Sequence, residues 1–75
     1  MMDRKDYNRT RIEYKDQLKL IRNLEIRIGI IESRMKAGDA YPEDEAELAE
    51  LNQGLRYRKR LASWLESRLA RYKVR

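Results

Sequence analysis

The side chains most closely grouped for a chemical role are the carboxylates of the stretch EDEAELAE, residues 43–50. Glu43, Glu47 and Glu50 are four and three residues apart, so on a helix they would share one face. Such a face could hold a metal ion, or it could be the solvated acidic start of a helix. The chain has no histidine and no cysteine, the commonest ligands of transition metals. We therefore expect neither a metal site nor any other cofactor.

The hydroxyl groups give no better candidate for catalysis. Ser33, Ser63 and Ser67 have no histidine in the chain to activate them as nucleophiles. The three glycines are isolated from one another, so there is no glycine-rich phosphate-binding loop. We expect that the protein is not an enzyme and that it acts by binding.

One segment, KAGDAYPED at residues 36–44, has the composition of a turn. Gly38 directly after Lys36 and Ala37 is typical of a helix that ends in a left-handed residue. Pro42 suits the first turn of a following helix, and the acids after it favour the positive end of the helix dipole. At the start of the chain, Asp3 with an aspartate three residues later is the expected N-cap.

These signals predict helices over about residues 4–36 and about 42–73, joined by a turn at 37–41. Two helices of similar length and a short turn describe an αα-hairpin. The predicted fold class is all-α: an antiparallel, coiled-coil-like two-helix hairpin that forms a single domain, residues 1–75.

The second predicted helix carries its seam residues at alternating intervals of three and four, the spacing of a coiled coil, and the first repeats apolar residues at intervals of seven. In the first helix a seven-residue interval runs through the isoleucine-rich stretch IRIGII, residues 26–31, which favours a helix over a strand there. The first seam comprises Tyr7, Tyr14, Ile21, Leu24, Ile28, Ile31 and Met35, with Leu18 beside it. The second comprises Leu48, Leu51, Leu55, Arg58, Ala62, Leu65, Leu69 and Tyr72, in which the arginine is a charged interruption.

Further apolar residues lie outside both seams, where a lone hairpin cannot bury them. Exposed apolar patches of this kind mark interaction sites. The predicted partner-binding residues are Ile26, Gly29, Ile30 and Ser33 in the first helix, and Tyr57, Leu61 and Trp64 in the second.

Two kinds of partner suit these residues, and they are compatible with each other. Two hairpins could stack as a homodimeric four-helix bundle, so that the extra residues become core. Alternatively, one face serves a different protein, with Trp64 and Tyr57 as the aromatic anchors typical of interfaces. We expect a homodimer that also binds a protein as its regulator, inhibitor or scaffold. Phage and mobile-element accessory proteins are often of this size and kind.

Charge is unevenly distributed along the chain: residues 38–55 contain six acids and no base, and residues 56–75 contain eight bases and one acid. In an antiparallel hairpin the bases near both chain ends gather at one end, which we call the basic pole. Dipole compensation accounts for the second helix but not for the bases that begin the first. The basic pole comprises Arg4, Lys5, Arg9, Arg11, Arg68, Arg71, Lys73 and Arg75.

Three interpretations of the basic pole remain open from the sequence. The pole is a solvated surface, or it attracts an acidic protein surface such as the turn of another copy, or it binds nucleic acid. In the last case the cations would contact phosphates, and Tyr7 and Tyr72 would stack on unpaired bases. A dimeric nucleic-acid-binding protein is therefore the alternative function.

The sequence points to a cytoplasmic protein. No window approaches the roughly 18 apolar residues of a membrane span, and the first residues, MMDRKDYNRTR, lack the apolar stretch of a signal peptide. The absence of cysteine gives no indication of an oxidising compartment. Residues 56–75 have the composition of a basic membrane-surface helix, but their seam continues that of residues 48–55, so we expect them in the bundle rather than on a membrane.

Overall fold

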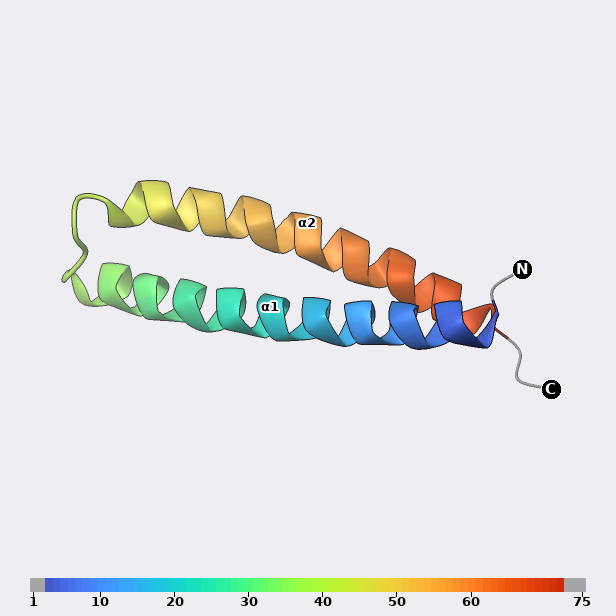
Figure 1. The fold of residues 1–75 in the computed structure, drawn as a ribbon. Helices are drawn as coiled ribbons and strands as arrows, with labels where there is room; N and C mark the ends of the chain where they lie inside the picture. The colour runs from blue at the N-terminus through green and yellow to red at the C-terminus, as the bar shows by residue number, and fades with distance from the viewer. Residues whose placement is uncertain (1–2, 73–75) are drawn as a thin grey trace.

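The computed structural model describes residues 3–72, and within that range the chain forms two α-helices and no strand (Figure 1). Helix α1 spans Arg4–Ala37 and helix α2 spans Asp44–Ala70. The helices run antiparallel, side by side, in a hairpin whose Cα atoms extend over 56 Å in length and 14 Å in each cross direction. The predicted all-α two-helix hairpin is confirmed.

Both ends of α1 carry the predicted caps. The Asp3 carboxylate accepts the backbone N–H of Asp6 at 2.8 Å and so satisfies one of the free donors of the first turn. Gly38 has a φ of 80°, in the left-handed region that glycine enters with little strain. The N–H groups of Gly38 and Asp39 then bond the carbonyls of the last helical turn. These bonds fix the point at which the chain leaves α1.

Helix α2 begins two residues later than predicted because residues 41–44 form a hydrogen-bonded turn. The Asp44 N–H donates to the Tyr41 carbonyl at 3.0 Å, and the Asp44 carboxylate accepts the Tyr41 N–H at 3.0 Å. Pro42 is the second residue of this turn, a position that its fixed φ favours. It therefore precedes α2 instead of occupying the first helical turn. At the other end, α2 stops at Ala70, before the predicted residue 73.

The core is a single row of side chains between the two helices. In residues 3–72 its buried apolar members are Ile21, Ile28, Ile31, Ala62 and Leu65. All predicted seam residues of α2 are buried or half-buried. Such a narrow core leaves most of both helices in contact with solvent. Neither helix contains an apolar stretch long enough to cross a bilayer.

The seam of α1 differs from the prediction at three places. Met35 and Leu18 are exposed rather than packed in or beside the seam. At the level of Met35 the residue that reaches α2 is Arg34, because its guanidinium binds Asp44. Near the other end, the polar residues Thr10 and Gln17 are buried and half-buried, and they continue the seam between the predicted apolar positions.

Candidate functional site

The predicted residues of α1 form an exposed surface that we call the outer face: Ile26, Gly29, Ile30 and Ser33. Their spacing of three, four and seven residues places them together on one side of the helix. All four are exposed, Ile26 at 56% and Ile30 at 46%. The buried isoleucines of the seam occupy the opposite side of α1. The outer face is therefore turned away from α2.

The predicted residues of α2 form a second surface together with Gly54, which lies one turn before them. We call this surface the flanking stripe: Gly54, Tyr57, Leu61 and Trp64. Tyr57 is 60% exposed and Trp64 is 54% exposed, while Leu61 and Gly54 are half-buried because they adjoin the seam. Arginine guanidinium groups lie 5.8 Å from the ring centroid of Tyr57 and 4.9 Å from that of Trp64. Cations at these distances are attracted to aromatic faces. Two large aromatic side chains thus remain open to solvent on one edge of the hairpin.

The structure does not bring the seven predicted partner-binding residues into one site. The flanking stripe borders the seam on the edge bridged by Arg27 and Glu47, because Gly54 and Leu61 follow Glu47 at heptad intervals. The outer face instead lies opposite the seam. A partner that covers one surface therefore leaves the other available.

Two glycines within the helices have no packing role inside the hairpin. A Cβ atom built at Gly29 or at Gly54 meets no other atom within 4 Å. Glycine in a helix interior costs about 1 kcal/mol relative to alanine. Nothing within residues 3–72 offsets that cost by close packing. Each glycine leaves a shallow gap on a surface where a neighbouring molecule could approach closely.

The basic pole is assembled by contact between the two chain ends. The rings of Tyr7 and Tyr72 stack at 4.3 Å between centroids with an angle of 21° between planes, which holds the start of α1 beside the end of α2 (Figure 1). Each ring therefore has one face on the other ring, and the stacking of these tyrosines on nucleic-acid bases stays a prediction. The described cations of the pole are all exposed: Arg4, Lys5, Arg9, Arg11, Arg68 and Arg71. Lys73 and Arg75 lie outside the described residues.

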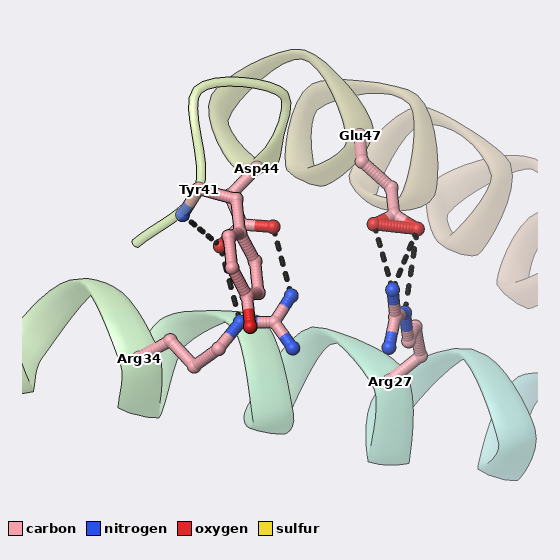
Figure 2. Close-up of polar contacts among 5 residues, drawn as sticks. All are labelled: Arg27, Arg34, Tyr41, Asp44 and Glu47. Atoms are coloured by element: carbon pink, nitrogen blue, oxygen red, sulfur yellow. Dashed lines mark hydrogen bonds and ion pairs between the residues drawn. The ribbon is translucent and has the colours of Figure 1, made fainter. Parts of the chain in front are cut away.

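The opposite end of the hairpin is closed by two ion pairs, which we call the turn-end clasp (Figure 2). Arg34 binds Asp44 through two parallel hydrogen bonds of 3.1 and 2.8 Å, and its guanidinium lies 4.9 Å from the Tyr41 ring centroid. Two turns earlier on α1, Arg27 contacts both carboxylate oxygens of Glu47 at 3.0 Å. A third pair, between Lys59 and Glu25, is longer and exposed. The ion pairs found in residues 3–72 therefore include no cation of the basic pole.

Asp44 is the buried charged residue of the clasp and is only 1% exposed. The hydrogen bond from Arg34 and the one from the Tyr41 N–H lower the pKa of Asp44 below its ordinary value, against the opposing effect of burial. The hydrogen bond between Arg34 and Asp44 also raises the pKa of Arg34. Charge in the clasp is thus neutralised within the hairpin. The clasp joins α1 to the turn and to the start of α2.

The acidic start of α2 lines an open recess of about 530 Å³ beside the clasp, bordered by Arg27, Arg34, Tyr41, Glu43, Asp44, Ala46, Glu47 and Glu50. Two of these acids are bound by the arginines of α1. In the part of the chain from residue 3 to residue 72, no three acidic side chains are arranged to hold a metal ion. The outer face, the flanking stripe and the basic pole are the candidate binding surfaces.

Comparisons of the chain with protein-family models, with curated proteins and with solved structures found no match.

Proposed function

We propose that this protein is a non-enzymatic protein-binding module, which regulates, inhibits or scaffolds another macromolecule through the apolar surfaces of its hairpin. The observation that carries the proposal is the exposure of large apolar side chains, Ile26 and Ile30 on the outer face and Tyr57 and Trp64 on the flanking stripe. Covering one such side chain yields roughly 1.5–3 kcal/mol. A complex in which a partner covers these side chains is therefore stabilised by their burial.

The outer face fits an apolar helix of a different protein. Ile26 and Ile30 flank Gly29, and Ser33 follows one turn later, so the surface has two apolar ridges around small residues. Small residues allow two helix backbones to approach closely and ridges to enter the opposing grooves. The open space at Gly29 supports this role, because the glycine has no packing function inside the hairpin.

The flanking stripe suits self-association into a four-helix bundle, which is the second part of the proposal. A hairpin with a core of one row gains a second layer of apolar contacts when two copies stack. The proposed compartment is the cytoplasm, since the sequence contains no cysteine for disulfide stabilisation.

The variant Ile30→Glu tests the binding of a different protein. Its matched control is Asn52→Glu, which adds the same charge at an exposed position of α2. Partners are captured with each protein from a cell extract, identified, purified and titrated by calorimetry. We expect a purified partner to bind the wild-type and Asn52→Glu proteins with equal Kd, and to bind Ile30→Glu at least about tenfold more weakly, the equivalent of one buried apolar contact. Equal affinity for all three folded proteins would remove the outer face from the proposal.

The alternative function is nucleic-acid binding by the basic pole. It is favoured by one observation: the pole's described cations are exposed and take no part in the ion pairs of residues 3–72. If about five phosphates are neutralised, log K should fall with log salt at a slope of about −4.5. The double variant Arg4→Glu/Lys5→Glu should abolish binding without weakening α1, because acids favour a helix start. Unchanged binding of a labelled oligonucleotide, measured by fluorescence anisotropy, would exclude this function.

A further inference from the structure

Helix α2 carries two parallel rows of residues at intervals of three and four. One row is the seam against α1. The other extends the flanking stripe at both ends and faces solvent; in order it contains Glu50, Gly54, Tyr57, Leu61, Trp64 and Arg68. A second heptad row on one helix predicts a second helix packed against it. Helix α1 covers this row only in part, since Gly54 and Leu61 are half-buried while the two aromatic side chains remain more than half exposed.

The extended stripe is complementary to itself when two copies run antiparallel. With a twofold axis at the level of Lys59, Tyr57 of one copy lies opposite Leu61 of the other, and each relation occurs twice by symmetry. In the same register the largest side chain, Trp64, lies opposite the gap left by Gly54. Large residues opposite small ones are what close interdigitation of helices requires.

Charge selects the same arrangement. In this register Glu50 lies opposite Arg68 of the other copy, so each end of the stripe is closed by an opposite charge. A parallel arrangement would put Glu50 against Glu50 and Arg68 against Arg68. A shift of one heptad would put Gly54 against Arg71, past the end of α2, or, in the other direction, Glu50 against Leu61 and Trp64 against Glu47. On a larger scale, antiparallel stacking brings the acidic residues 38–55 of each copy toward the basic residues 56–75 of the other.

The exposed area of the hairpin is sufficient for such an interface. A compact monomer of 9.1 kDa exposes about 4,900 Å², whereas the hairpin exposes 6355 Å². The difference exceeds the roughly 800 Å² that each partner contributes to an interface of standard size. Leu20 of α1 lies on the same edge, seven residues before Arg27, and is 40% exposed. Three residues earlier Gln17 bonds Arg58, so Leu20 lies about one helical turn from the level of the proposed axis.

We propose that two copies of this chain pack antiparallel through the extended stripe of α2, in the register that places Gly54 opposite Trp64 and Glu50 opposite Arg68. This interface deepens the proposed self-association and rests on it. The outer face of α1 stays uncovered in the dimer, so that one assembly displays two copies of the proposed site for a different protein.

A charge-reversal series tests the register. Glu50→Arg places arginine opposite arginine at both ends of the interface, and Arg68→Glu places glutamate opposite glutamate. The double variant restores opposite charges. The two positions are too far apart on one helix to contact each other, so a rescue must occur between copies. Arg60→Glu, on an exposed position outside the stripe, is the control for a change of charge alone.

The dimer dissociation constant is measured by sedimentation velocity, with circular dichroism as the check on helix content. We expect each single reversal to raise the dissociation constant about tenfold or more, and the double variant to return it to within about threefold of wild type. Arg60→Glu should change it by less than about twofold. A dimer that none of the reversals weakens, or that the double variant fails to restore, would overturn the register.

A wild-type protein that stays monomeric at every concentration would overturn the interface itself. That result would leave the binding of a different protein by the outer face untouched, because Ile30→Glu tests it separately. Rescue by the double variant also excludes misfolding as the cause of the single effects.

Discussion

Arg34 holds Asp44 at the turn end of the hairpin by two hydrogen bonds, Nε to Oδ2 at 3.1 Å and Nη2 to Oδ1 at 2.8 Å. Bidentate pairing of this kind is stronger and more directional than a single ionic contact. The carboxylate also accepts the Tyr41 N–H, so one buried side chain joins α1, the turn and α2. The contact lies at the residue where α2 begins.

Asp44→Asn should destabilise the hairpin because it removes the charge from the clasp while the shape of the side chain is kept. We expect Tm to fall by about 5 °C or more, followed by circular dichroism at 222 nm. Glu45→Gln is the control, since it removes one negative charge from the exposed neighbouring position. Equal Tm values for the two variants would show that the clasp does not stabilise the fold.

The clasp should also make stability depend on pH in the acid range. The pKa of Asp44 is lower in the folded protein than its ordinary value of 3.8. Its contribution to the free energy of unfolding is therefore complete above about pH 3.8, and it is lost as the pH falls through the folded pKa. Urea unfolding of the wild-type and Asp44→Asn proteins should give stabilities that converge below pH 3.8. A difference that stays constant down to pH 2 would contradict this assignment.

Much of the fold could be predicted from the sequence, because its signals are local. Gly38 marks the end of α1, and the heptads of α2 identify the residues that face α1. The clasp could not be predicted in this way: Asp44 has the same local pattern as the other acids after Pro42, and only packing distinguishes it. Thr10 and Gln17 are part of the seam. A pattern of apolar residues does not include them, because their side chains are polar. Met35 has the interval of a seam residue but is exposed. Arg34 reaches α2 at this level instead, because it pairs with Asp44 across the turn.

The residues of the candidate surfaces could be predicted from the sequence, but the positions of the surfaces relative to each other could not. Helical periodicity places Ile26 with Ile30 and Tyr57 with Trp64, and each pair is exposed. Whether the pairs share a face depends on how α1 and α2 are rotated about their axes. That rotation is set by contacts between distant residues, such as Arg27 with Glu47. The separation of the two surfaces therefore emerged only with the fold.

The stack of Tyr7 on Tyr72 should couple the ends of the two helices. In a double-mutant cycle with Tyr7→Ala and Tyr72→Ala, the coupling energy should be about 0.5–1.5 kcal/mol, the range for stacked aromatic pairs. Urea unfolding of the four proteins supplies the numbers. The cycle of Asn8→Ala with Tyr72→Ala is the control, since Asn8 is exposed. Equal coupling in both cycles would argue against a specific contribution of the stack.

Alanine should have opposite effects at Gly29, inside α1, and at Gly38, directly after its end. Gly29→Ala should raise the free energy of unfolding by up to about 1 kcal/mol, because the added methyl group meets no atom and alanine favours the helix. Gly38→Ala should lower it by roughly 1 kcal/mol, because the φ of 80° is unfavourable for a residue with a Cβ. Chemical unfolding of the two variants measures both effects. The same Gly29→Ala protein should bind a purified partner of the outer face more weakly, and a gain in both properties would contradict close approach at Gly29.

The most direct test of the proposed self-association is the solution mass of the 75-residue protein, measured by light scattering after gel filtration over a wide range of concentrations. If a second copy covers the flanking stripe, the mass should be about twice the 9.1 kDa of one chain at the higher concentrations. A mass of one chain at every concentration would contradict self-association, and it would leave Tyr57 and Trp64 exposed for a different protein.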